Sequence, residues 1–220
     1  MSAEEKDRLL LAILPHVAFD GWGEEALRRG AEDLGMAAAA ARELLPGGAR
    51  GQVLAFADWA DRAMLAGLAA GEPEGLGTTA RVAHAVRLRF EALAPYEEAV
   101  RGGLRILALP SAGLSGLTSL HRTSDAIWNA VGDRSTDHNW YSKRLLLGGV
   151  ISATTLYWLD DRSEGKQRTW AFLERRLRDV VRIGGRLGRG MNEALSLPDR
   201  LAQRLQQRRA WRRPVRRPPL

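Results

Sequence analysis

The apolar residues of this 220-residue chain recur at the spacing of helices almost throughout, and no segment sustains the period-two alternation of a strand. Glycine and proline divide the pattern into about nine helices before a C-terminal tail. We expect these helices over residues 4–14, 24–34, 37–45, 53–70, 78–93, 95–109 and 114–131, then from caps at 135–137 to about 160, and over 165–183. The sequence therefore predicts an all-α fold.

Two helix ends are predicted from single residues. The first helix is expected to stop before Pro15, because proline donates no backbone hydrogen bond and disfavours the helix interior. The second is expected to end at Gly35, since glycine readily adopts the left-handed conformation of a C-terminal cap.

The first three expected helices, with a glycine turn between the second and the third, have the outline of a helix-turn-helix. The third helix of such a motif must offer side chains to base edges and phosphates. Here it reads Ala-Ala-Ala-Ala-Ala-Arg-Glu-Leu-Leu from Ala37, so a single arginine stands beside a glutamate. We therefore expect no specific binding to nucleic acid.

The C-terminal segment is basic and amphipathic. Leucines four residues apart, a tryptophan and flanking arginines predict a helix that lies in a membrane surface. A disordered basic tail, or one that binds nucleic acid non-specifically, is the alternative interpretation. The residues expected to contact the membrane are Leu197, Leu201, Leu205, Trp211, Arg208 and Arg212.

Length and charge define three parts of the chain. The length suits one sizeable core, so one compact domain and a tail are expected. The net charge of +7 belongs to residues 199–220, which hold eight arginines and one acid, while residues 1–198 are neutral overall. We expect a helix-turn-helix-like part over 1–48, a larger helical part of the same domain over 49–185, and a flexible junction and tail over 186–220. No apolar run is long enough to span a bilayer, and no signal or transit peptide is visible.

The chain lacks the residue patterns of common catalytic and metal sites. It has no cysteine, and its four histidines form no His-x-x-x-His or Glu-x-x-His pair. It has neither a phosphate-binding Gly-x-x-x-x-Gly-Lys loop nor a Gly-x-Ser-x-Gly elbow. The adjacent Asp160 and Asp161 would point apart on a helix and indicate a helix end. We therefore expect no enzymatic activity, no cofactor and no bound metal.

Residues 132–144 read Gly-Asp-Arg-Ser-Thr-Asp-His-Asn-Trp-Tyr-Ser-Lys-Arg and combine helix-capping side chains with two aromatic residues. Two interpretations are equally compatible with this composition. The tryptophan and tyrosine could be exposed as a partner-binding site, or they could pack beneath a neighbouring helix as part of a buried cap.

Several segments together resemble the coenzyme Q biosynthesis protein nine family, over about residues 8–185. They are His84-Ala-Val-Arg-Leu-Arg-Phe, Asp125-Ala-Ile-Trp, the 132–144 segment, Leu156-Tyr-Trp-Leu-Asp-Asp-Arg-Ser-Glu-Gly and Thr169-Trp-Ala-Phe-Leu-Glu-Arg-Arg. The chain departs from the family at His138, where an aromatic residue is commoner. The resemblance implies a TetR-like helical fold with a vestigial helix-turn-helix that does not bind DNA.

The resemblance also implies a function. Such a protein binds an isoprenoid quinone or a phospholipid in an apolar pocket and docks to a ubiquinone-pathway hydroxylase. It would be a homodimer, cytoplasmic and peripheral on the inner membrane, or on the mitochondrial matrix face if the protein is eukaryotic. The composition suggests a bacterial member. The implied pocket residues are Leu104, Leu107, Leu117, Leu120, Trp128, Leu146 and Val150. The implied partner-binding residues are Asp125, Ile127, Asp137, Trp140, Tyr141 and Arg144. The alternative is a TetR-type regulator that binds DNA and a hydrophobic ligand.

Overall fold

The computed structural model describes residues 2–71, 73, 75–132, 138–180 and 182, with only the backbone of residues 138–142. The chain divides into two compact units, Met1–Arg178 and Asp179–Leu220. The helices and the cavity lie in the first unit.

The described part of this unit is helical and holds no strand, as the sequence predicts. A further helix begins at residue 167, so the described residues hold about the expected number of helices. The α-helices are α1 (Ala3–Asp20), α2 (Glu24–Asp33), α3 (Ala38–Leu44), α4 (Gly48–Ala70), α5 (Thr78–Leu93), α6 (Glu97–Leu107), α7 (Gly113–Ala130) and α8 (His138–Asp160). Single 3₁₀ turns, Ala94–Tyr96 and Glu164–Lys166, precede α6 and the last helix.

The expected stop at Pro15 is wrong, because α1 continues through it to Asp20. A proline inside a helix removes one backbone hydrogen bond. Pro15 itself lies on the exposed side, whereas Val17 beyond it is buried in the core, so packing keeps the helix going. The expected cap at Gly35 is confirmed: its φ is 62°, and the amide of Met36 donates to the carbonyl of Ala31 at 2.8 Å.

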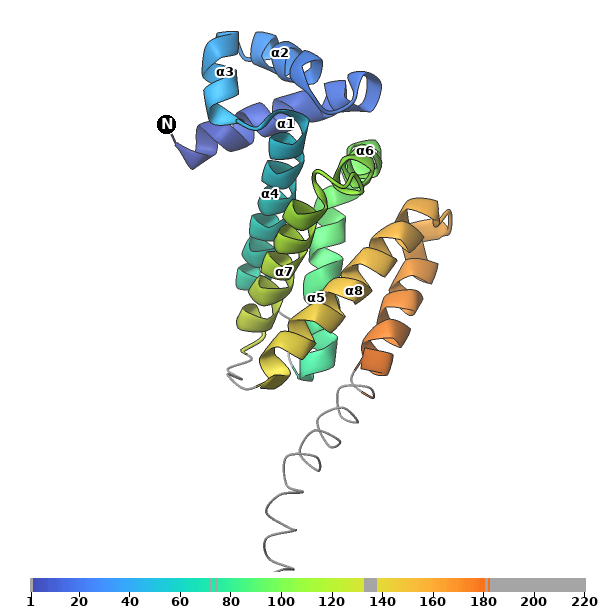
Figure 1. The fold of residues 1–220 in the computed structure, drawn as a ribbon. Coiled ribbons are helices and arrows are strands. Elements are labelled where there is room, and N and C mark those ends of the chain that lie inside the picture. Colours follow the sequence, from blue (N-terminus) through green and yellow to red (C-terminus); the bar gives the residue numbers. More distant parts are fainter. Residues whose placement is uncertain (1, 72, 74, 133–137, 181, 183–220) are drawn as a thin grey trace, which may run out of the picture. The chain divides into compact units, whose positions relative to one another are not determined.

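Helices α1, α2 and α3 lie together at one end of α4 (Figure 1). The loop between α1 and α2 joins them to the rest of the unit. Trp22 is buried there, and its indole Nε1 donates to the carbonyl of Ala99 at 2.8 Å. The amide side chain of Gln52 accepts from the backbone of Gly23 at 3.0 Å and donates to it at 3.1 Å. These bonds fix the N-terminal helices against α4 and α6.

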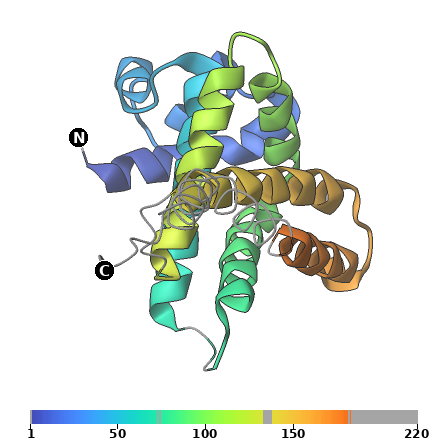
Figure 2. The same ribbon diagram turned by 60° about the horizontal axis from the view of Figure 1, so that its bottom comes forward.

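The remaining helices form a bundle in which α4 packs against both α5 and α7, and α7 packs against α8. The last helix runs beside α8 in both ribbon views (Figures 1 and 2). Tyr157 of α8 stacks on Phe172 of this helix with ring centroids 4.6 Å apart. The largest buried side chains of the bundle include Met64, Phe90, Ile127, Leu147 and Trp158. This core holds the helices that surround the cavity described next.

Candidate functional site

A cavity of about 440 Å³ lies among α4, α5, α6, α7 and α8. This volume lies within the range of small-molecule pockets, and most of the lining side chains are apolar. The cavity is lined by Val53, Phe56, Ala57, Arg89, Leu93, Ala99, Val100, Gly103, Leu104, Leu107, Ala108, Gly113, Gly116, Leu117, Ser119, Leu120, Thr123, Ile151, Ser152 and Thr155.

Small residues keep this space open. Gly103 lets α6 approach α4, since a Cβ at this position would lie 3.1 Å from Cγ1 of Val53. Gly116 faces Leu107 across the cavity wall, where a Cβ would lie in ordinary contact at 3.4 Å. With glycine and alanine at six lining positions, the bundle closes without filling its centre.

The cavity opens to solvent beside the start of α7. Leu117, which lines it, is 64% exposed, and the nearby Leu114 is 81% exposed. The loop before α7 is tied to α4 by Arg50, whose Nη1 donates to the carbonyl of Ser111 at 3.3 Å. The exposed leucines at this opening offer an apolar molecule a contact surface where it would enter.

One buried ion pair stands behind the apolar wall. Nε of Arg89 in α5 donates to Oδ1 of Asp61 in α4 at 2.7 Å, and the side chains are 11% and 8% exposed. The hydroxyl of Thr123 in α7 lies 3.1 Å from Oδ1 of Asp61 and 2.8 Å from Oδ2. Three helices thus hold this pair, and Arg89 is the member that faces the cavity.

The structure brings four of the seven expected pocket residues to this cavity, namely Leu104, Leu107, Leu117 and Leu120. The other three, Trp128, Leu146 and Val150, lie outside its lining. Nζ of Lys143 lies 5.5 Å from the ring centroid of Trp128, whose Nε1 is buried without a partner among the described residues. The sequence reasoning missed Arg89. The one local signal was its place between Leu88 and Phe90, in a helix that also carries Arg81, Arg87 and Glu91.

The expected partner-binding residues divide into buried, half-buried and undescribed positions. Ile127 is 0% exposed and Arg144 is 1% exposed, so the surface patch expected from the sequence does not include their side chains in this conformation. Nε of Arg144 donates to Oδ1 of Asp125 at 2.6 Å, which fastens α8 to α7. Asp125 is half-buried. Asp137 and the side chains of Trp140 and Tyr141 lie outside the described residues.

The helix-turn-helix outline carries little of the charge that DNA binding requires. Residues 2–48 hold nine acidic and five basic side chains. Arg42, the one arginine of α3, donates from Nε to Glu24 at 2.8 Å. The backbone arrangement is therefore present without a surface that would attract phosphate.

Other kinds of site find no counterpart in the part of the chain that the structure describes. Within it, no three His, Asp or Glu side chains gather as metal ligands. None of the described helices combines the length and the apolar composition needed to cross a bilayer. The expected membrane-contacting residues, Leu197 to Arg212, lie outside the described residues.

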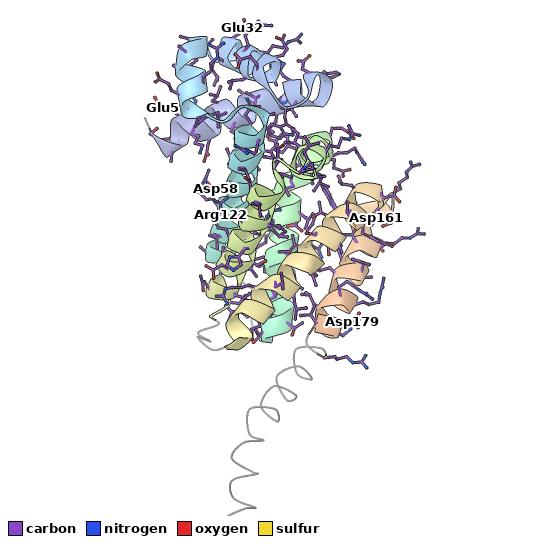
Figure 3. All side chains as sticks on the ribbon, in the orientation of Figure 1. Glu5, Glu32, Asp58, Arg122, Asp161 and Asp179 are labelled. Carbon is purple, nitrogen blue, oxygen red and sulfur yellow. The ribbon has the colours of Figure 1, made fainter. Side chains whose placement is uncertain are left out.

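Asp161 lies at the corner between α8 and the last helix (Figure 3). It is buried and accepts four hydrogen bonds. The amide and hydroxyl of Ser163 donate to Oδ1, and those of Thr169 donate to Oδ2, at 2.7–2.9 Å. Burial raises the pKa of this carboxyl, but the four hydrogen bonds outweigh burial and hold the pKa below its ordinary value. The pair Asp160–Asp161 is thus a helix end, as the sequence indicates.

Residues 114–184 match the COQ9 family model. The chain is 34% identical to the human "Ubiquinone biosynthesis protein COQ9, mitochondrial" over 184 residues, which cover 80% of this chain and 58% of that protein. It is 30% identical to the Drosophila melanogaster protein of the same name over 180 residues, covering 80% of this chain and 55% of that protein. The chain therefore spans little more than half the length of these curated relatives.

The fold has a counterpart among solved structures. The crystal structure of the TetR transcriptional regulator from Nitrosomonas europaea ATCC 19718 matches with a TM-score of 0.64 at 21% identity, covering 81% of this chain and 98% of that one. The TetR-like arrangement expected from the sequence is confirmed, and at this identity the likeness is one of fold.

Proposed function

Because this chain belongs to the COQ9 family, we propose that it is a non-enzymatic lipid-binding protein of ubiquinone biosynthesis. It holds an isoprenoid quinone intermediate in the cavity between α4 and α8 and presents it to a pathway hydroxylase at a membrane surface. The observation that carries this proposal is the apolar cavity of about 440 Å³, lined by four leucines that were expected there.

The lining combines many apolar side chains with a few polar ones, which suits a ligand with a long apolar chain. Burying a long apolar chain in such a cavity is favoured by roughly 25 cal/mol for each Å² removed from water. A pocket of this kind needs few polar groups, which serve to orient the ligand. The exposed Leu114 and Leu117 at its opening would let an isoprenoid chain pass from a membrane with little exposure to water.

Lipid extraction and mass spectrometry of the purified protein test this function. We expect an isoprenoid quinone or its precursor to copurify in a ratio approaching one per chain. Protein that is folded by circular dichroism, is free of lipid and takes up none from added vesicles would contradict the proposal.

Docking to the hydroxylase is assigned to Asp125, Asp137, Trp140 and Tyr141, and the membrane contact to the C-terminal tail with its leucines and arginines. A homodimer belongs to the same proposal, since TetR-like domains often dimerise. Trp140→Ala is expected to keep the helical fold and weaken binding to the hydroxylase several-fold in a pull-down or calorimetric titration. Loss of folding in this variant would instead restore a buried-cap role for the tryptophan.

A TetR-type regulator is the second candidate, favoured by the shared fold with a transcriptional regulator. It would require sequence-selective, salt-dependent DNA binding. The pairing of Arg42 with Glu24 and the acidic excess of residues 2–48 argue against it. A mobility-shift assay with DNA from the region upstream of its own gene separates the two functions.

A further inference from the structure

Arg89 occupies an unusual position for a charged side chain. Of the lining residues in the described part of the chain, it alone carries a charge. Its Nε donates to Asp61 at 2.7 Å, and its Nη2 lies 3.5 Å from the carbonyl oxygen of Ala57, a long hydrogen bond. Within the described residues, Nη1 forms no hydrogen bond at all. The guanidinium therefore brings unused N–H donors to the wall of an apolar cavity.

Stability of the bundle does not explain this arrangement. Moving two charges out of water is costly, and apolar residues of similar volume commonly hold a protein core at least as well. Thr123 does not need the ion pair as a hydrogen-bond partner, because its hydroxyl also lies 3.1 Å from the carbonyl oxygen of Ser119. A buried pair with spare donors is better explained by a ligand that uses them.

The charge balance indicates which ligand fits. Asp61 neutralises Arg89, so the cavity has no net charge to offer a full anion. A phosphate or carboxylate entering it would remain an uncompensated buried charge. A neutral oxygen acceptor meets the spare N–H groups without that cost, and arginine has donors in a planar fork for such an oxygen.

We propose that Arg89 is the head-group subsite of the cavity, donating hydrogen bonds from its terminal nitrogens to a ring carbonyl oxygen of an isoprenoid quinone intermediate. Asp61 acts as a positioning residue that accepts from Nε of Arg89, and Thr123, which also lines the cavity, donates to Asp61. The apolar residues from α6 and α7 contact the isoprenoid chain. This inference rests on the proposed function and adds to it a preference for the ring.

The test compares three probes by native mass spectrometry in detergent: a short-chain ubiquinone, the isoprenoid hydrocarbon farnesene and a short-chain phosphatidylglycerol. The double variant Asp61→Leu/Arg89→Met removes the pair without leaving either charge alone. We expect it to bind the ubiquinone about tenfold or more weakly, the loss of a hydrogen bond from a charged donor, and farnesene as the wild type does.

Two further variants keep the test decisive. Arg122→Met removes an arginine that is 54% exposed on α7 and should bind all three probes like the wild type. Arg89→Lys retains the charge opposite Asp61 but loses the planar fork of donors, so its affinity for the ubiquinone should fall several-fold. This single variant provides the test if the double variant does not fold.

The results separate this inference from the proposed function. Equal losses for ubiquinone and farnesene, or no loss for either, would overturn the role of Arg89. A loss confined to phosphatidylglycerol would show that the guanidinium serves a phosphate and would overturn the carbonyl assignment. A wild-type protein that binds none of the probes would instead contradict lipid binding altogether.

Discussion

Two buried aspartates in this bundle have opposite surroundings. Asp161, at the corner between α8 and the last helix, accepts four hydrogen bonds from two residues within eight positions of it. Asp61, in the middle of α4, is held by side chains 28 and 62 residues away, and its arginine partner faces a cavity. The carboxylate of Asp161 stabilises the turn after α8. The carboxylate of Asp61 positions Arg89, some of whose N–H groups have no hydrogen-bond partner among the described residues.

The difference teaches that burial of a charge does not by itself identify a functional group. What distinguishes the two is whether all the donors and acceptors of the cluster are used within the protein. The hydroxyls of Ser163 and Thr169 both donate to Asp161, so we expect this corner to contribute to stability and not to ligand binding. The spare N–H groups of Arg89 predict that the second cluster serves ligand binding, and that removing the whole pair changes the free energy of unfolding little.

The largest expected effect is on folding at the corner. Asp161→Ala leaves the buried donors of Ser163 and Thr169 without their acceptor and should lower the free energy of unfolding by about 3 kcal/mol. Urea denaturation followed by circular dichroism measures this loss. Asp160→Ala, at the exposed neighbouring position, is the matched control and should change stability by less than about 0.5 kcal/mol. Equal losses in both variants would remove the special role of Asp161.

A larger side chain in the cavity lining should reduce the amount of bound lipid. Gly116→Leu places a side chain against Leu107 within the lining and should reduce copurifying lipid about tenfold, with no loss of stability because leucine favours a helix over glycine. Mass spectrometry of extracted lipid gives the ratio. Gly149→Leu makes the same change at an exposed position of α8 with open space around it. If it loses as much lipid, the cavity is not the binding site.

A smaller effect follows from the pKa of Asp161, which lies below its ordinary value. The unfolded carboxyl takes up a proton near pH 4 while the folded one does not, so the stabilisation present at neutral pH falls as the pH is lowered. The wild type should lose about 1 kcal/mol through this group between pH 5 and about pH 3. Asp161→Asn has no such proton to bind, so its urea midpoint should depend less on pH over the same range. Parallel pH profiles would contradict the assignment.

The smallest expected effect is on stability at the cavity wall. Replacing the pair in Asp61→Leu/Arg89→Met should leave the free energy of unfolding within about 1 kcal/mol of the wild type. Asp61→Leu alone should cost more, since it leaves Arg89 buried without its counter-charge. Urea denaturation of both variants measures this difference. A double variant as unstable as Asp161→Ala would show that both clusters stabilise the fold, and it would contradict the distinction between them.

The sequence by itself determined the helices, the cap at Gly35, the helix end at Asp160–Asp161 and the poverty of α3 in base-reading side chains. These features depend on periodicity, on glycine conformation and on residue type, all of which act over a few positions. The resemblance in the 84–90, 125–128, 132–144, 156–165 and 169–176 segments also determined the family.

Only the tertiary structure decided the rest. Pro15 lies within α1 because Val17 is buried against other helices, a gain that local propensity does not contain. Arg144 and Ile127 are buried in the bundle, where α7 packs against α8, although the family resemblance implied that both belong to a surface patch. The cavity is space left unfilled between helices that are distant in sequence. Arg89 is the charged residue in its lining, and it is held there by Asp61, 28 residues away. Periodicity assigns a side chain to an inward face, and the packing of the neighbouring helices decides whether that face is filled or hollow.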